Sequence, residues 1–262
     1  MPAKPYPTFD GFSLQTDNYI IEKIVYRNTP TRNLNSQKIA RQPGSKLLST
    51  DFSERKINLS GSIIGSSPSN LQSLIDDIHS NITRKDSVTI FIDADRSATA
   101  TVASVGIGDS HYNMDYVPFE MEFLMNNPFF YGLQQTVFHV IPSGSSSFTD
   151  TITISGSVYS EPSITYNAPT GTGYTTTNAI SLTYNNTGET VTWSGTGLTP
   201  TLAYSDLVQF DFDNHRIIEG VTEAPIEGVF ARWEPGLQSY QVTFSGFTQG
   251  GTLNFVYQPR YL

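Results

Sequence analysis

The 262-residue chain contains no cysteine, and only 15% of its residues are charged. The missing cysteines exclude disulfides and thiolate metal sites, and the chain can therefore mature in a reducing cytoplasm. No segment approaches the roughly 20 apolar residues of a membrane span. Residues 1–10 lack the apolar core of a signal peptide. We therefore expect neither membrane insertion nor secretion.

Low charge is accompanied by abundant Ser, Thr, Asn, Gly and aromatic residues, a composition typical of β-rich proteins. The net charge of -9 is unevenly distributed. Residues 1–60 hold nine Lys and Arg against five Asp and Glu, whereas residues 61–262 hold six against nineteen. An acidic body disfavours wrapping of nucleic acid, because phosphate neutralisation needs clustered basic residues.

The basic stretch from Lys23 to Lys56 is suited to contact an acidic protein neighbour, and the alternative is a solvated loop. Within it, Lys38, Arg41 and Lys46 are candidate interface residues.

The first half of the chain combines one helix with several strands. After "GSSPSN", apolar residues recur with helical spacing at Leu71, Leu74, Ile75, Ile78 and Ile82. This spacing predicts a helix over about 68–83, with Ser67 as N-cap and Pro68 at the first helical position. Strands are predicted at residues 56–63 and at "SVTIFIDA", "ATATVASVGI", "DYVPFEMEFLMN" and "QTVFHVI". Residues 1–141 are therefore interpreted as an N-terminal β domain with one amphipathic helix.

A small polar segment, residues 142–149, is predicted to be a linker. Beyond it, short alternating strands recur with Gly, Asn and Pro between them, which is typical of a β-sandwich. Residues 150–262 are therefore interpreted as a C-terminal β-sandwich domain. The predicted fold class is mostly β, with one helix in the N-terminal domain.

Motifs of catalysis are largely missing. The sequence contains no G-x-S-x-G, no G-x-x-x-x-G-K and no G-x-G-x-x-G. The four histidines, His79, His111, His139 and His215, show no metal-binding spacing. We expect no cofactor and no enzymatic activity.

Two acidic pairs are weak metal candidates: Asp93 with Asp95, and Asp211 with Asp213. Alternate residues of a strand point the same way, so each pair offers oxygens to a hard cation such as calcium. The interpretation we favour is a turn role, because each pair follows an apolar strand and Asp side chains bond nearby backbone groups.

Aromatic residues allow two interpretations. Trp193 and Trp233 fit either a sugar-stacking platform or, more commonly, a sandwich core. Phe129, Phe130 and Tyr131 fit either an exposed anchor of a protein interface or the interior of the domain.

The order of elements in both halves resembles the distal tail protein family of siphophages, which form the tail tip or baseplate hub. In the first half the resemblance rests on "RKINLSGSIIG", the helix after it and "FEMEFLMNNPFFYG". In the second it rests on "SDLVQFDFDNHRIIEG", the Pro235-Gly236 turn before an alternating strand, and the ending "TLNFVYQPRYL". It covers most of the chain as an ordered pattern rather than as an invariant motif.

The resemblance implies a structural component of the virion, assembled in the host cytoplasm and located at the tail tip. Its N-terminal domain is then a β-sandwich-like ring domain and its C-terminal domain a galectin-like β-sandwich. The implied partners are further copies of the chain in a homohexameric ring, the tail tube protein and the tail tip hub protein. DNA only passes through the channel of the ring, and no membrane partner is implied.

Two other functions remain open at this stage. A carbohydrate-binding β-sandwich in host-surface adsorption is motivated by Trp193, Trp233 and the low charge. An enzyme that uses the Asp pairs ranks last.

Overall fold

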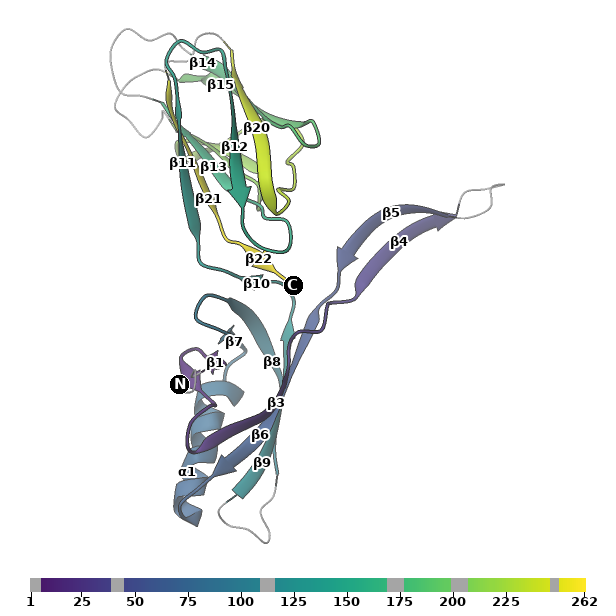
Figure 1. Cartoon of the computed structure of the whole chain (residues 1–262), viewed down its shortest axis with the longest axis vertical. Coiled ribbons are helices and arrows are strands. Elements are labelled where there is room, and N and C mark those ends of the chain that lie inside the picture. The colour runs from purple at the N-terminus through teal and green to yellow at the C-terminus, as the bar shows by residue number, and fades with distance from the viewer. Residues whose placement is uncertain (1–5, 39–44, 109–115, 169–176, 199–206, 246–249) are drawn as a thin grey trace. The chain divides into compact units, whose positions relative to one another are not determined.

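The computed structural model describes residues 6–38, 45–108, 116–168, 177–198, 207–245 and 250–262 (Figure 1). The chain forms two compact units, Met1–Tyr131 with Leu262, and Gly132–Tyr261. Both units are built mainly from antiparallel strands, and the described part of the chain has one α-helix, which lies in the first unit. The predicted mostly-β fold class is thus confirmed. Among the described residues, no helix has the length and apolar character to cross a membrane.

Among its described residues, the first unit has ten strands: β1 (Thr8–Phe9), β2 (Phe12–Ser13), β3 (Tyr19–Val25), β4 (Arg32–Lys38), β5 (Ser45–Phe52), β6 (Arg55–Ile64), β7 (Ser87–Phe91), β8 (Ser97–Ile107), β9 (Tyr116–Met125) and β10 (Phe130–Tyr131). The main sheet has the order β2-β1-β7-β8-β9-β6-β3, and neighbours in this order run antiparallel. Strands β4 and β5 pair only with each other and form a separate two-stranded sheet.

The β6–β9 pair carries the core of this sheet. Ile57 lies opposite Phe123 and Leu59 opposite Met121, and all four side chains are buried. The alternation of buried and exposed residues along both strands is the expected consequence of the two-residue repeat. Gly61 belongs to the same buried row, where an added Cβ would lie 2.2 Å from the carbonyl oxygen of Ile20. Only glycine allows β3 to approach β6 this closely.

Helix α1 (Pro68–Ile78) covers one face of the sheet (Figure 1). It begins as predicted, because the Ser67 hydroxyl oxygen accepts a hydrogen bond from the Asn70 N–H at 3.2 Å and Pro68 follows the cap. The helix continues as one π-helical turn, η1 (His79–Thr83). Its buried face also receives a hydrogen bond from the Tyr19 hydroxyl to the Leu74 carbonyl oxygen, 2.9 Å, and burial raises the pKa of Tyr19 to about 12.

The described part of the second unit contains twelve strands: β11 (Gln135–Ile141), β12 (Ser147–Ile154), β13 (Ser163–Asn167), β14 (Thr177–Tyr184), β15 (Glu189–Leu198), β16 (Leu207–Asp211), β17 (Arg216–Glu219), β18 (Thr222–Ala224), β19 (Ile226–Gly228), β20 (Gly236–Phe244), β21 (Gly251–Tyr257) and β22 (Arg260–Tyr261). One sheet has the order β11-β21-β13-β16-β17-β18 and the other β12-β20-β14-β15-β19. The two sheets enclose a common core and form a β-sandwich.

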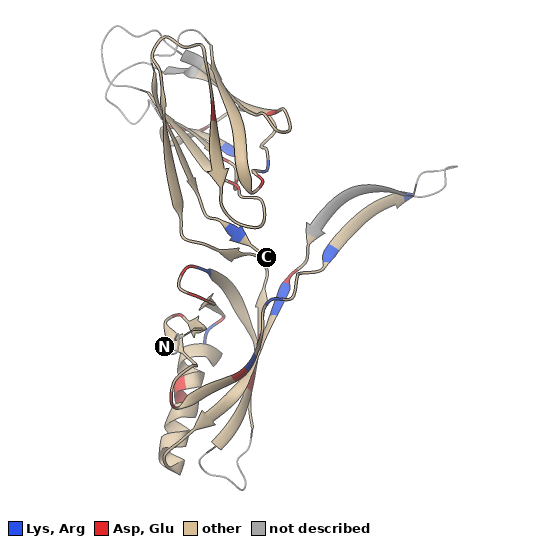
Figure 2. Ribbon diagram, in the orientation of Figure 1, with Lys and Arg blue, Asp and Glu red and all other residues tan. Residues whose placement is uncertain are grey.

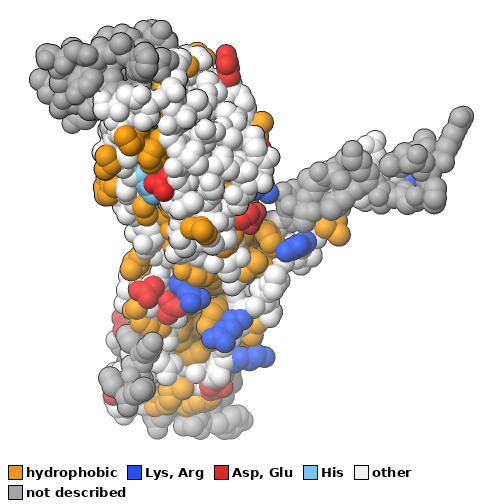
Figure 3. Space-filling model, turned by 45° about the horizontal axis from the view of Figure 1, so that its top comes forward, with side chains coloured by type: hydrophobic (Ala, Val, Ile, Leu, Met, Phe, Trp, Pro, Cys, Tyr) orange, Lys and Arg blue, Asp and Glu red, His pale blue; other side chains and the backbone are white. Residues whose placement is uncertain are grey.

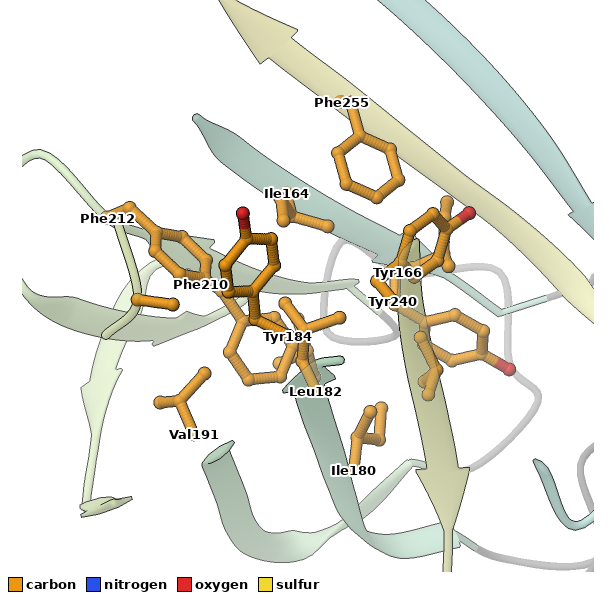
Figure 4. Packing of buried hydrophobic residues seen from close by; sticks show 14 of the residues in the cluster. Ile164, Tyr166, Ile180, Leu182, Tyr184, Val191, Phe210, Phe212, Tyr240 and Phe255 are labelled. Atoms are coloured by element: carbon orange, nitrogen blue, oxygen red, sulfur yellow. The ribbon is translucent and has the colours of Figure 1, made fainter. Parts of the chain in front are cut away.

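The sandwich core is rich in aromatic rings (Figure 4). Tyr240 and Phe255 come from opposite sheets, and their ring centroids lie 4.9 Å apart. Trp233 contacts both rings, at 6.1 and 5.7 Å. Tilted and edge-to-face pairs of this kind add to the stabilisation that comes from burial alone. The rings therefore hold the two sheets together.

The boundary between the units differs from the sequence-based expectation. Strand β11, which the sequence analysis assigns to the N-terminal domain, pairs along its whole length with β21 of the sandwich. Part of the expected linker, residues 147–149, belongs to β12 and pairs with β20. The small polar residues between these strands form a turn within the sandwich. The second unit therefore begins at Gly132 rather than at residue 150.

This boundary predicts which fragments fold alone. A fragment of residues 132–262 should unfold cooperatively, whereas a fragment of residues 142–262 lacks β11 and the buried Ile141. Loss of one edge strand exposes several apolar side chains, at about 1.5–3 kcal/mol each. Urea denaturation followed by circular dichroism should therefore show a much lower midpoint for the shorter fragment. Equal midpoints would contradict the assignment of β11 to the sandwich.

Candidate functional site

The β4–β5 hairpin forms an arm that projects from the first unit (Figure 1). Residues 31–38 are all exposed, and Leu34 keeps 64% of its surface in solvent. A single two-stranded hairpin is at best marginally stable in water, because it lacks a second layer against which to bury apolar surface. The arm is therefore a segment that a neighbouring protein surface would stabilise.

The root of the arm is fixed by aromatic packing. The Ser53 N–H and hydroxyl both donate to the Thr31 carbonyl oxygen, at 2.8 and 2.9 Å. The Arg32 guanidinium lies 5.2 Å from the centroid of the Phe52 ring, which packs edge-on against Phe129. Contacts with the first unit thus hold the root of the arm in place. The described residues of β4 extend beyond the root and are exposed to solvent.

Basic residues dominate the arm and its surroundings (Figure 2). Lys38, one of the predicted interface residues, lies exposed at the end of β4. Lys46 lies in β5, but its side chain is outside the described part of the structure, as is the whole of Arg41. The stretch from Lys23 to Lys56 contains eight Lys and Arg and two acids. Such an arm favours a negatively charged neighbour.

The aromatic run at the end of the first unit lies in its interior. Phe129 and Phe130 are buried, and Tyr131 is half-buried with its hydroxyl oxygen accepting a hydrogen bond from the Asn127 side chain at 2.5 Å. Phe129 packs on the root of the arm and Phe130 on Tyr26. Of the two interpretations left open by the sequence, the structure favours packing for Phe129 and Phe130. Their effect on the arm is to support its root.

Sequence analysis did not identify Arg55, the first residue of β6. Its side chain lies on the buried face of the strand, in the same row as Ile57 and Leu59, and only 2% of its surface is exposed. None of its guanidinium nitrogens has a hydrogen-bond partner among the described residues. The guanidinium lies 5.1 Å from the centroid of Phe130, and burial lowers its pKa. Because arginine remains charged in proteins, a positive charge is buried here, and no carboxylate among the described residues forms an ion pair with it.

Arg260 in the second unit shows the usual solution to such burial. It is 7% exposed, and its guanidinium pairs with Glu161 at 2.7 Å and with Asp213 at 3.0 Å. These two ion pairs compensate the buried charge, so Arg260 stabilises the sandwich. Arg55 and Arg260 are thus both buried, but among the described residues only Arg260 has ion-pair partners.

The acidic pair Asp211 and Asp213 lies around the turn that joins β16 to β17. Asp211 accepts hydrogen bonds from the Asn214 side chain at 2.8 Å and from Arg216 Nε at 2.9 Å, while Asp213 pairs with Arg260. Burial alone would raise the pKa of Asp211, but the hydrogen bonds from Asn214 and Arg216 outweigh it and hold this pKa below its usual value. Both carboxylates therefore act in ion pairs that fix the hairpin.

The other acidic pair has the geometry of a turn. The Asp93 carboxylate accepts a hydrogen bond from the Asp95 N–H at 2.9 Å and lies 3.4 Å from Arg96 Nε. Asp95 is exposed. Among the residues that the structure describes, no group of three or more His, Asp or Glu side chains is arranged to hold a metal ion.

Each described histidine has its own local contacts. His79 Nδ1 lies 3.1 Å from the Thr83 hydroxyl, and the His215 ring packs edge-on against Phe230. His139 Nδ1 lies 2.7 Å from an Asp150 carboxylate oxygen, a contact that joins β11 to β12 at the side of the sandwich. His111 is outside the described residues.

Neither tryptophan is available for sugar stacking, because Trp193 and Trp233 are both fully buried in the sandwich. Trp193 Nε1 donates to Glu219 at 3.2 Å. The core interpretation thus holds for both residues, and the carbohydrate-binding alternative loses the residues that motivated it.

Comparisons with known proteins agree with this architecture. Residues 10–125 match the family model of the phage tail protein RIFT-related domain. The crystal structure of the Dit (gp 19.1) protein of phage SPP1, described as a paradigm of the hub adsorption apparatus in phages that infect Gram-positive hosts, has a TM-score of 0.70 at 15% identity, and 98% of each chain is covered. A chain of the phage P2 baseplate, in its activated conformation with Ca, is 12% identical, with 95% of this chain and 92% of that chain covered and a TM-score of 0.42. No curated protein sequence matches.

The match to this family model covers most of the first unit. Over nearly its whole length the chain has the fold of the SPP1 Dit protein. The resemblance to siphophage distal tail proteins that the sequence indicates is thereby confirmed.

The contacts of Asp211 predict a pH-dependent loss of stability in Asp211→Asn. At pH 7 the substitution should lower the free energy of unfolding by about 1.5–3 kcal/mol, the value of a hydrogen bond to a charged group. Because the pKa of Asp211 is lower in the folded than in the unfolded chain, its contribution is complete above about pH 4–5 and disappears as the pH falls through the folded value. Urea denaturation of both proteins between pH 2 and pH 7 checks this.

The matched control is Asp95→Asn, because Asp95 is exposed and its side chain is not the one that closes the turn. We expect a change within about 0.5 kcal/mol at every pH. An Asp211→Asn variant that behaves like this control would show that the ion pair with Arg216 contributes nothing.

Proposed function

We propose that the chain is a distal tail hub protein that assembles head to tail into a closed ring, joins the tail tube to the tail tip or baseplate, and leaves a channel for DNA. The role is structural, not enzymatic. The proposed partners are other copies of the chain, in a homohexamer, together with the tail tube protein and the tail tip hub protein. The proposed location is the virion tail tip, after assembly in the host cytoplasm.

The observation that carries this proposal is the exposed β4–β5 arm. The hairpin projects from an ordered root, and the side chains of residues 31–38 are exposed. Contact with a second copy of the chain would cover these side chains and stabilise the hairpin. A contact between the arm of one copy and a different surface of the next is heterologous, and repeated contacts of this kind close into a ring when the rotation permits. The fold shared with the SPP1 Dit protein, a hub component, supports the same role.

Charge supports the contact. The arm and its root are basic, whereas the second unit contains three arginines and no lysine against ten Asp and Glu. In the first unit, the exposed side of α1 carries Asp76 and Asp77. Several acidic surfaces are thus available on a neighbouring copy, and their attraction to the arm favours association of like subunits despite the net charge of -9.

Light scattering tests the ring directly. The full-length chain should give a mass several times 28.9 kDa, and replacement of residues 33–51 by a short Gly-Ser linker should reduce it to the monomer mass. The variant should remain folded, because the arm is a separate two-stranded sheet. A control that replaces the turn residues 186–188 of the second unit with Gly-Ser should assemble like the wild type.

Two results would contradict the proposal. One is a wild-type chain that stays monomeric at high micromolar concentration, also with its tail partners present. The other is an arm-deleted chain that assembles as well as the wild type, because the arm would then carry none of the association.

Salt gives a further prediction. Screening shortens the reach of exposed charges from about 10 Å at 0.1 M to about 3 Å at 1 M ionic strength. If the basic arm contributes to the contact, the assembled mass should fall in 1 M NaCl while the circular dichroism spectrum stays unchanged. An assembly that is insensitive to salt would instead point to apolar contacts.

A further inference from the structure

We propose that β11 is a strand-addition site, whose free edge binds an extended segment of a partner protein other than this chain. The segment adds one strand to the β11-β21-β13-β16-β17-β18 sheet. It carries apolar side chains at alternate positions and belongs to a neutral or basic protein. This inference concerns the second unit alone and does not depend on the proposed ring.

The first argument is the free edge itself. Among the described residues, β11 pairs with β21 along its whole length, from Gln135 opposite Tyr257 to Ile141 opposite Gly251, and with no other strand. The main-chain N–H and C=O groups of an antiparallel edge strand point alternately toward its neighbour and toward the outside. The outward groups of β11 therefore form a row of donors and acceptors that fits another extended main chain.

The second argument is the lack of protection along this edge. Edge strands are usually kept from pairing by charged side chains, proline, bulges or short length. The seven residues of β11, QTVFHVI, include no Lys, Arg, Asp, Glu or Pro. Their register with β21 has no bulge. Of the usual devices, β11 thus has none.

The other described edges of the sandwich differ from β11 in this respect. Strands β18 and β19 have only three residues each and contain Glu223 and Glu227, and β12 contains Asp150. In the first unit, the edge strand β3 contains Lys23 and a bulge beside it. The fold thus protects its other long edges. An exception to such a rule is expected where the exposed feature has a function.

The third argument is the apolar row on the outer face of β11. Val137 packs against the sandwich core, whereas Phe138 and Val140 point the other way and keep 67% and 73% of their surface in solvent. Their neighbours on β21 are the polar residues Asn254 and Thr252. A strand added at the free edge would place side chains beside both apolar residues, at cross-strand distances of about 4.5–5.5 Å. Apolar side chains at alternate positions of the partner segment would therefore be buried.

The opposite row of the added strand meets a polar surface. His139 Nδ1 lies 2.7 Å from an Asp150 carboxylate oxygen, and 41% of the Asp150 side chain remains exposed. Hydroxyl side chains fit beside this carboxylate, because they donate hydrogen bonds and bring no charge that must lose its water. The matching segment therefore alternates apolar residues with Thr or Ser.

Charge argues against a second copy as the occupant. The second unit contains three arginines and no lysine against ten Asp and Glu. Pairing β11 of one copy with β11 of another would bring two acidic units, each with its Asp150, side by side. Their repulsion opposes this arrangement, whereas a basic partner would be attracted.

A labelled peptide tests the site in the full-length chain. The peptide is Lys-Gly-Thr-Val-Thr-Val-Thr-Val-Gly-Lys with blocked ends, and binding is measured by fluorescence anisotropy. A first control peptide carries N-methyl groups on all six Thr and Val residues, so it keeps the side chains and the charge but donates no strand hydrogen bonds. A second has Glu in place of both Lys. We expect the first peptide to bind, the Glu peptide to bind more weakly and the N-methylated peptide not to bind.

Matched variants locate the binding. Phe138→Lys and Val140→Lys each place a charge on the outer row of β11, and each should weaken peptide binding at least tenfold. The control Leu237→Lys adds the same charge at a residue that is 68% exposed on β20, a strand flanked by β12 and β14. It should bind the peptide like the wild type. All three variants should keep the circular dichroism spectrum of the wild type, because the replaced side chains are exposed.

Four results would overturn the site: no binding of the first peptide, equal binding of its N-methylated form, full binding by both β11 variants, or equal loss in the Leu237 control. A second copy would be identified as the occupant instead if Phe138→Lys lowered the assembled mass while the wild type bound no peptide. Peptide binding by a wild-type chain that never assembles would leave this site standing and contradict the ring alone.

Discussion

The antiparallel pairing of β6 with β9 is the interaction on which the first unit depends. It runs without a break from Arg55 opposite Met125 to Ile64 opposite Tyr116, and it places the long strands β3 and β8 on either side. Because side chains alternate with a period of two, this register decides at once which residues enter the core. The same register places the Arg55 side chain in the core. The same pairing fixes the start of β6, and the arm leaves the domain three residues before that point, at the end of β5.

The second unit solves a different problem. Its two sheets bury their apolar faces against each other through a dense set of aromatic rings. Side chains that bear charge are drawn into pairs at the edges of this core, as Asp211 is with Arg216 and Arg260 is with Glu161. The space-filling view shows a histidine side chain next to an acidic one, with apolar side chains around them (Figure 3). The described core of the sandwich pairs its charges, whereas in the first unit Arg55 has no hydrogen-bond partner among the residues that the structure describes.

Much of this architecture could be predicted from the sequence. The spacing of Leu71, Leu74 and Ile78 with Ser67 before them located the helix, because amphipathic spacing and N-capping are local properties. The position of the unit boundary, by contrast, depends on pairing between strands that are far apart in the sequence. The polar run after Ile141 has the composition of a linker, and only the pairing of β11 with β21 reveals that it is a turn.

The two features of greatest functional interest were harder to foresee. The residues of β4, RNLNSQK, show no apolar alternation, so the arm was visible only as a basic stretch. Arg55 lies two positions before Ile57 in a row of apolar residues, and that single mismatch was the available signal. Its missing partner depends on the whole surrounding fold. Residues far apart in the chain decide such properties, and a pattern along one strand does not contain them.

The separate two-stranded arm has a kinetic consequence. The amide hydrogens of α1 are protected by packing within one subunit, so their exchange with solvent is governed by the stability of that subunit. Those of β4 are held by a single neighbouring strand and are released whenever the hairpin frays. Contacts with a second copy would protect the arm by mass action. Hydrogen exchange in β4 would then slow as protein concentration rises, while exchange in α1 stays constant, so the arm would report how much of the protein is assembled.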